Sequence, residues 1–218
     1  MRNVPISAAV FVHGLFLNGA EFTLLRRRLA RDFGIAGHRF SYPTVHGSVD
    51  GAVERLRRFV QRVEADRIHF VAHSLGGVVL CRYFEAYPCD RPGRVVMLGS
   101  PLGGSRSARA VARHALTRRI VGPLVNAELV DECRPRCWQC AAELGVIAGT
   151  SPLGLGRFFA RFDEDCDGTV AVSETKLPGQ TAHLTLPVSH MGMLANAGVA
   201  RQVGAFLQTG QFLAEKSV

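Results

Sequence analysis

The sequence lacks a long hydrophobic segment. No stretch approaches the roughly eighteen consecutive apolar residues that a membrane-spanning helix needs. The first apolar run, Ile6 to Val12, ends at once in His13-Gly14, whereas a secretory signal peptide has a longer apolar stretch followed by a cleavage site. We therefore interpret this run as a buried strand and expect a cytoplasmic protein. Export by a route without a cleaved signal and peripheral contact with a membrane stay open.

The sequence also has too little cysteine for its length to be a disulfide-based scaffold. It contains six cysteines in 218 residues, and a chain of this size buries a substantial core without disulfides or a structural metal. Cys133, Cys137 and Cys140 have a spacing that can hold an iron–sulfur cluster or zinc, but a tetrahedral zinc site wants a fourth ligand. Free thiols are the favoured interpretation, with zinc or a disulfide as alternatives. We expect one domain over residues 1–218.

Acidic residues are in the minority. The 18 Asp and Glu residues against 26 Lys and Arg give a formal charge of +8, which comes mostly from arginine. Such a surplus favours contact with an anionic lipid surface, a nucleic acid or an acidic protein. Because the arginines are spread over several expected helices and form no recognised nucleic-acid-binding motif, we expect no nucleic-acid partner.

What the sequence does contain is a regular alternation of apolar runs with segments of helical period. This pattern is typical of a mostly parallel sheet flanked by helices. The expected strands are Ile6–Val12, Arg39–Tyr42, Ile68–Ala72, Val95–Leu98, Val146–Ala148 and Leu184–Leu186. The expected helices are Ala20–Phe33, Val49–Ala65, Gly76–Tyr87 and Ala195–Leu207. The sequence therefore predicts an α/β fold with a sheet of about six strands.

Between Ser100 and Gly145 the alternation lapses, and we interpret residues 104–145 as a small helical cap inserted into the domain. Within it, residues 104–120 are expected to form one helix, with Val111, Ala115 and Ile120 on one side and arginines on the other. A basic amphipathic helix of this kind would dock on an anionic membrane or an acidic acyl carrier protein. A solvated surface without a partner is the alternative.

The strongest functional signal is the stretch from Phe70 to Val79, in which a strand runs through Ser74 into an apolar helix. This is typical of a nucleophile elbow, a tight strand-to-helix turn that projects a serine hydroxyl from the sheet. Small residues two positions before and after the serine let strand and helix pass closely. Gly76 fits this pattern, while Ala72 stands where glycine is usual. A serine that merely caps a helix is the alternative interpretation.

A second signal directly follows the first strand. There His13-Gly14-Leu15-Phe16 occupies the place where a backbone donor to an oxyanion is needed. Two preorganised N–H groups stabilise the charge of a tetrahedral intermediate. We expect them to be the amides of Leu15 and Leu75, with Phe16 and His73 lining the substrate site. His73 is interpreted as part of the elbow turn, not as a catalyst.

The segments Val12–Gly14, Ala72–Gly77, Leu98–Ser105, Asp167–Val170 and Ser189-His190 together resemble a small α/β-hydrolase of the lipase and esterase kind. The sequence is similar to compact bacterial lipases and to lipase-like inositol deacylases, over nearly its whole length. The resemblance implies a minimal α/β-hydrolase fold that begins at the third strand of larger members. It also implies the catalytic order serine, aspartate, histidine.

Asp167 is the expected acid, because it opens Asp167-Gly168-Thr169-Val170 after a late strand and resembles the family's position. Asp163 and Asp165 are the substitutes. An acidic stretch of this kind is also compatible with a solvated turn or a calcium loop, and a full EF-hand pattern needs in addition a glutamate further on at the right spacing.

His190 is the expected base, since it lies just past the last expected strand, where the fold needs a base. His183 is the serious rival, but it precedes that strand. We therefore expect a serine hydrolase that cleaves acyl esters through an acyl-serine intermediate, with no cofactor or metal. A thioesterase or an acyltransferase would share the same residues, and a non-catalytic binding protein on the same fold is the alternative of another class.

Overall fold

A six-stranded parallel sheet forms the centre of the computed structural model, which describes residues 6–88, 90–131, 136–153 and 162–214. The strand order is β2-β1-β3-β4-β5-β6, and every neighbouring pair is parallel. The strands are β1 (Ser7–Val12), β2 (Ala36–Phe40), β3 (Arg67–His73), β4 (Pro92–Leu98), β5 (Leu144–Gly149) and β6 (Ala182–Leu186). The predicted α/β fold is confirmed.

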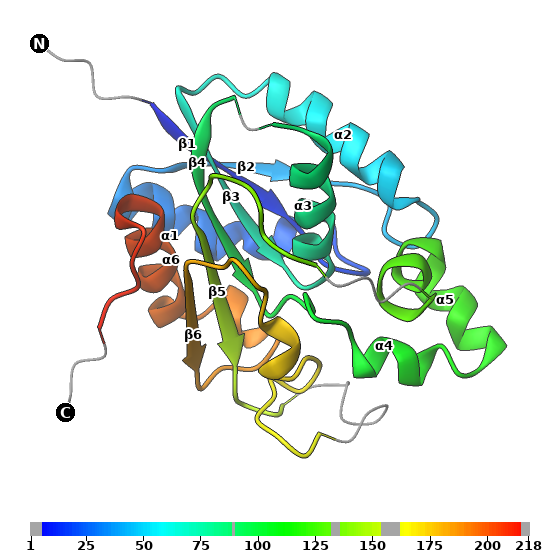
Figure 1. Cartoon of the computed structure of the whole chain (residues 1–218). Helices are drawn as coiled ribbons and strands as arrows, with labels where there is room; N and C mark the ends of the chain where they lie inside the picture. The colour runs from blue at the N-terminus through cyan, green and yellow to red at the C-terminus, as the bar shows by residue number, and fades with distance from the viewer. Residues whose placement is uncertain (1–5, 89, 132–135, 154–161, 215–218) are drawn as a thin grey trace, which may run out of the picture.

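Helices cover both faces of the sheet (Figure 1). Helices α1 and α6 pack against each other on one face, and α2 and α3 do so on the other. Their bounds are α1 (Thr23–Phe33, after the short η1, Ala20–Phe22), α2 (Val49–Gln61), α3 (Leu75–Ala86) and α6 (Ala197–Thr209). Because both faces are covered, the inner strands β1 and β5 are buried almost throughout and do not alternate between apolar and polar residues, whereas the edge strands β2 and β6 are partly exposed.

Strand β1 shows how one run of residues serves two cores. Val10 and Val12 belong to the apolar cluster under α2 and α3, whereas Ala9 and Phe11 belong to the cluster under α1 and α6. All four side chains are fully buried. Since successive side chains of a strand point to opposite faces, a continuous apolar run of this length fills both layers.

The second strand begins three residues earlier and ends two residues earlier than expected. It was predicted at Arg39–Tyr42, but β2 is Ala36–Phe40 and pairs with β1 from Ala8 onward. Tyr42 leaves the ladder because its backbone N–H and its hydroxyl are both bonded to His13. The predicted helix Val49–Ala65 likewise ends earlier, at Gln61.

The segment between β4 and β5 contains α4 (Arg106–Val111), α5 (Ala115–Val125) and the π-helical turn η2 (Asn126–Asp131), which we call the cap (Figure 1). The prediction of one helix over 104–120 was wrong. The chain turns after Val111, and the Thr117 hydroxyl bonds to the carbonyls of Val111 and His114 across the break. Ala115 is exposed. The prediction of a single domain with an insertion at 104–145 stays a prediction.

No helix within the described ranges has the length and apolar character to cross a membrane. Of the cysteines in those ranges, Cys137 is exposed and Cys140 half-buried, and both are free thiols, as are Cys81 and Cys166. Cys133 lies outside the described residues.

His69 on β3 provides a pH-dependent contribution to stability. Its side chain is 2% exposed, and its Nδ1 accepts the backbone N–H of Arg94 at 2.9 Å. Burial, with the nearby charges of Arg67 and Arg94, lowers its pKa from 6.5 to about 4. Between these two values the unfolded chain binds a proton that the folded chain does not, so the free energy of unfolding falls as the pH falls. The expected contribution is about 3 kcal/mol over this window.

We expect the free energy of unfolding of a His69→Asn variant to fall less steeply than that of the wild type as the pH is lowered. Its amide oxygen replaces the acceptor for Arg94 but does not titrate. Urea unfolding measures the free energy of unfolding of both proteins at several pH values between about 7 and 4. This range brackets the two pKa values of His69. An equally steep loss of stability in the variant would contradict the assignment.

Candidate active site

Ser74 occupies the turn between β3 and α3. Its backbone angles are φ 54° and ψ −124°, a conformation that L-residues rarely adopt, and its N–H donates to the Leu98 carbonyl at 2.9 Å. Such strain is held in place by surrounding structure and concentrates at functional sites. The turn exposes Ser74 at the carboxyl edge of the sheet, as a nucleophile elbow requires.

Gly76 makes this turn sterically feasible. A Cβ at this position would lie 2.2 Å from the carbonyl oxygen of Val12, so no larger residue fits between α3 and the end of β1. Ala72, where the usual pattern has glycine, is fully buried within the strand. The close approach of helix to strand therefore depends on Gly76 and tolerates the methyl group of Ala72.

The loop after β1 is fixed by His13, a role that the sequence did not reveal. The buried ring stacks on Tyr42 with centroids 4.5 Å apart, its Nε2 accepts the Tyr42 N–H at 3.2 Å, and its Nδ1–H donates to the Gly14 carbonyl at 2.9 Å. The Tyr42 hydroxyl donates to the His13 carbonyl at 2.9 Å. Burial lowers the pKa of His13, which keeps this ring neutral.

These contacts hold the start of the loop that contains Leu15 and Phe16. The N–H of Phe16, at φ 60°, donates to the Thr44 hydroxyl at 3.2 Å and is thereby engaged within the loop. Leu15 and Leu75, predicted as the oxyanion donors, both line the cavity that contains Ser74. The two predicted donors, one after β1 and one at the start of α3, thus border the same cavity as Ser74.

Asp167 and His190 lie in direct contact. The His190 Nδ1–H donates to Asp167 Oδ2 at 2.6 Å, and the His190 backbone N–H donates to the Asp167 carbonyl at 2.9 Å. The other carboxylate oxygen accepts the N–H groups of Thr169 at 2.9 Å and Val170 at 2.7 Å. Asp167 is 1% exposed and His190 7%. The carboxylate therefore fixes the ring so that its Nε2 is left for another partner.

Gly99, at the end of β4, leaves room for this pair. It has φ 53°, and a Cβ there would lie 2.8 Å from Asp167 Oδ2 and 3.1 Å from His190 Nδ1. A side chain at this position would separate the two groups. The absence of a side chain at Gly99 thus allows the Asp167 carboxylate and the His190 ring to stay in contact.

His73 contacts His190 from the other side. Its Nε2–H donates to the His190 carbonyl at 3.0 Å, and the two rings lie 4.6 Å apart. Burial, with the neighbouring His190, holds the pKa of His73 well below its usual value of 6.5, so His73 is neutral. It borders the cavity but is only 1% exposed. Its contact supports the loop that carries His190.

The alternative site residues lie elsewhere. His183 bonds through Nε2 to the Thr175 hydroxyl at 2.8 Å and does not line the cavity. Asp163 and Asp165 are exposed. Within the described residues, no group of three His, Cys, Asp or Glu side chains is arranged to hold a metal ion. The carboxylate of Asp167 is already fully engaged by His190 and two backbone amides.

A cavity of about 450 Å³ opens beside Ser74 and His190. Its walls come from the loop after β1, the elbow, the acid loop and the cap, and they are almost entirely apolar. Phe16, predicted to bind substrate, borders it and is 61% exposed. Among the described residues that line it, none is Asp, Glu, Lys or Arg. The site therefore combines a small set of polar groups with a large apolar space, as ligand pockets commonly do.

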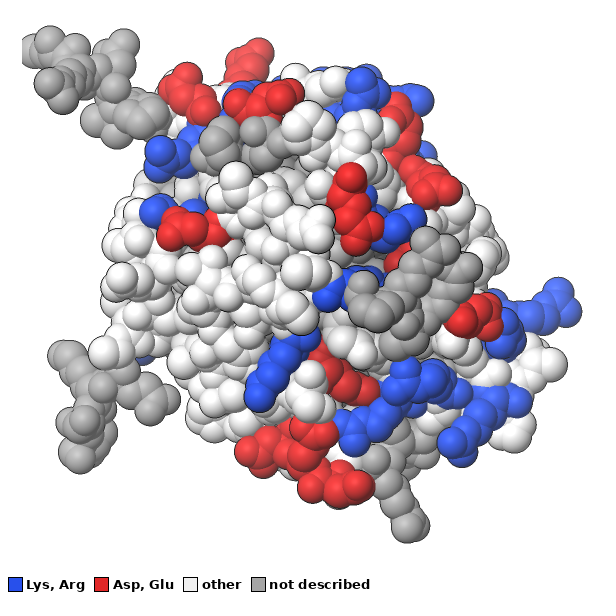
Figure 2. Space-filling model, in the orientation of Figure 1, with Lys and Arg blue, Asp and Glu red and all other residues white. Residues whose placement is uncertain are grey.

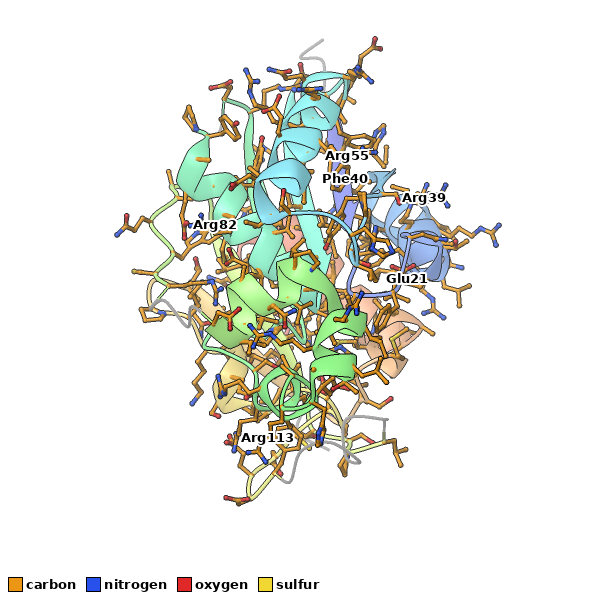
Figure 3. The ribbon with its side chains drawn as sticks, turned by 90° about the vertical axis from the view of Figure 1, so that its right-hand side faces the viewer. Glu21, Arg39, Phe40, Arg55, Arg82 and Arg113 are labelled. Carbon is orange, nitrogen blue, oxygen red and sulfur yellow. The ribbon has the colours of Figure 1, made fainter. Side chains whose placement is uncertain are left out.

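Basic side chains gather over the cap, at the lower right of Figure 2. Arg106 pairs there with Glu164 and Glu174, and Arg118 pairs with Asp131 at 2.6 Å. Figure 3 looks onto the cap, with Arg113 labelled at its lower end. The predicted acyl carrier protein or anionic membrane partner stays a prediction.

Solved structures share this fold at low sequence identity. The mature form of a lipase from Bacillus licheniformis is 16% identical, with a TM-score of 0.66 over 93% of this chain and 91% of that chain. A metagenomic carboxyl esterase is 18% identical, with a TM-score of 0.62 over 85% of this chain and 64% of that chain. A phospholipase from Legionella pneumophila is 20% identical, with a TM-score of 0.59 over 78% of this chain and 44% of that chain.

The chain spans 52% of the propeptide form of the Bacillus lipase. Among curated proteins, none matches the sequence. The family model described as the alpha/beta hydrolase family matches residues 9–190, well over half of the 218 residues. The chain therefore belongs to the alpha/beta hydrolase family, and bacterial lipases and esterases are among its structural neighbours.

Proposed function

We propose that this protein is a serine hydrolase that cleaves carboxylic esters with apolar acyl groups. The observation that carries the proposal is the 2.6 Å contact between Asp167 and His190, with His190 and the strained Ser74 bordering one apolar cavity. A neutral histidine whose Nδ1–H is held by a carboxylate presents Nε2 as a general base. Ser74 supplies the hydroxyl from which that base takes a proton.

In the first half of the proposed reaction, Ser74 Oγ attacks the ester carbonyl carbon while His190 Nε2 takes the hydroxyl proton. The carbonyl oxygen becomes an oxyanion that accepts hydrogen bonds from the backbone N–H groups of Leu15 and Leu75. His190 then returns the proton to the alcohol as the bond between the carbonyl carbon and the alcohol oxygen breaks. The products of this half are an acyl-serine and the free alcohol.

In the second half, water attacks the acyl-serine and gives a proton to His190. Collapse of the second tetrahedral intermediate releases the carboxylic acid and returns the proton to Ser74 Oγ. Asp167 stays ionised and stabilises the positive charge on His190 in both halves. Only groups of this chain and water take part.

The experiment is hydrolysis of p-nitrophenyl esters from acetate to palmitate by the purified protein, beside the variant His190→Ala. We expect hydrolysis of at least one ester and a loss of about 10⁴-fold in kcat in the variant. His183→Ala is the matched control, because His183 is another partly buried histidine but does not border the cavity. Equal losses in the two variants, or no hydrolysis at any chain length, would contradict the proposal.

A further inference from the structure

The cavity beside Ser74 has an exposed mouth and a buried end. Phe16, Ile120 and Met191 border it and are 50 to 61% exposed, so they form the mouth. Val125 and Leu129, from the end of α5 and from η2, border the same cavity and are 2% and 4% exposed. The exposed lining residues mark the opening of the cavity to solvent, and the buried cap residues Val125 and Leu129 mark its inner end.

This shape orients the substrate. The alcohol must leave for solvent before water can reach the acyl-serine, whereas the acyl chain stays covalently attached. The alcohol therefore belongs at the mouth, and the acyl chain belongs in the buried arm. Because the described residues that line that arm carry no charged side chain, an ionised group on the acyl chain would lose its hydration there without compensation from them. The arm fits a neutral aliphatic chain.

The closed end is held rigidly. Arg136 is buried, and its Nη2 donates to the carbonyl of Glu128 at 2.7 Å and to the Glu128 carboxylate at 2.9 Å. Its Nη1 donates to the Leu102 carbonyl at 3.2 Å, in the loop after β4. Arg136 thus ties the residue next to Leu129 to the body of the molecule. A buried ion pair with these additional hydrogen bonds resists displacement, since Arg136 without Glu128 would be an uncompensated buried charge. Glu128 also forms an ion pair with Arg82, at 3.5 Å.

We propose that Leu129 is the residue that limits the length of the acyl chain, and that the Arg136–Glu128 pair holds it in place. This inference rests on the proposed ester hydrolysis and adds its specificity: neutral acyl chains up to the length at which they meet Leu129. A longer chain would have to displace a wall that is fixed at two points. The result is a sharp limit in chain length, not a gradual decline.

The test compares Leu129→Phe and Leu129→Ala on p-nitrophenyl acetate, butyrate, octanoate and palmitate. For each variant we divide kcat/KM for the longest ester that the wild type accepts by kcat/KM for acetate. We expect Leu129→Phe to lower this ratio by about tenfold or more, since steric contacts of this size discriminate by that order. Leu129→Ala is expected to raise kcat/KM about tenfold for the next longer ester. Leu116→Phe is the matched control, because it makes the same change at an exposed position on α5 outside the cavity.

The ratio of two esters measured in one preparation does not depend on the fraction of folded protein. A destabilised variant therefore still tests the inference. Arg136→Met is expected to broaden the limit, so that esters beyond it gain activity relative to acetate. If the wild type hydrolyses none of the esters, the proposed function fails. If the wild type is active but both Leu129 variants keep its ester profile, only the inference about Leu129 is overturned.

Discussion

Replacing Ser74 by alanine is expected to lower kcat by about 10⁴-fold or more, because the variant lacks the hydroxyl that attacks the ester in the proposed reaction. Substrate binding is expected to change little, since the apolar cavity keeps its walls. Steady-state kinetics on a p-nitrophenyl ester measures both quantities. Ser100→Ala is the control: Ser100 is a fully buried serine that follows β4 and does not border the cavity. A Ser74→Ala variant with more than about a tenth of wild-type kcat would contradict the assignment.

The same position makes a second, independent prediction about stability. At φ 54° and ψ −124°, serine and alanine are both strained, whereas glycine adopts this conformation at little cost. Ser74→Gly is therefore expected to be as inactive as Ser74→Ala but more stable, by about 1 kcal/mol after allowing for glycine's greater entropy in the unfolded chain. Urea unfolding of the two variants measures the difference. A glycine variant that is less stable than the alanine variant would show that the turn is not strained.

Replacing Asp167 by asparagine is the second large effect, with an expected loss of about 10³- to 10⁴-fold in kcat. The amide oxygen of asparagine still accepts the N–H groups of Thr169 and Val170, so the acid loop keeps its shape. Its NH₂ group then faces His190 Nδ1 and donates to it. His190 must therefore carry its proton on Nε2, where it cannot take the proton of Ser74.

Asp165→Asn is the matched control for this variant, since Asp165 lies in the same acidic stretch but is exposed. Its kcat is expected to stay within about twofold of the wild type. Circular dichroism checks that both variants fold. A loss in Asp165→Asn as large as that in Asp167→Asn would reassign the acid.

The alternation of apolar runs with helical segments was enough to predict the order of the elements, because a parallel sheet with both faces covered requires continuously apolar strands. The boundaries depended on contacts that the pattern does not contain. Strand β2 ends before Tyr42 because that residue bonds to His13, which is 29 positions away in the sequence. The cap has two helices because Thr117 closes a turn after Val111, although the apolar period continues through the break.

The residues of the candidate site also differ in how far the sequence alone predicts them. Ser74 and His190 were predicted from local patterns, since an elbow and a loop after the last strand are defined by their neighbours in sequence. The sequence pattern favoured Asp167 but left Asp163 and Asp165 as substitutes, because all three are acidic and lie within four positions. Burial separates them, because only Asp167 is enclosed and bonded to His190.

The supporting contacts were not predictable from sequence. His13 holds Gly14 and Tyr42, and Arg136 holds Glu128 and Leu102, a residue 34 positions away. An arginine and a glutamate eight positions apart have no distinctive spacing, and a histidine after a strand is compatible with many turns. These pairs exist only because the fold brings distant loops to one edge of the sheet.

The most direct test of the account is the reaction of the protein with a fluorophosphonate, which phosphonylates an activated serine but not an ordinary one. Intact-mass analysis followed by peptide mapping identifies the site. We predict a single adduct on Ser74, absent in Ser74→Ala, formed far more slowly in His190→Ala and unchanged in His183→Ala. No adduct under conditions that label a known serine esterase, or an adduct on another residue, would contradict the claim that Ser74 is the nucleophile of a hydrolase.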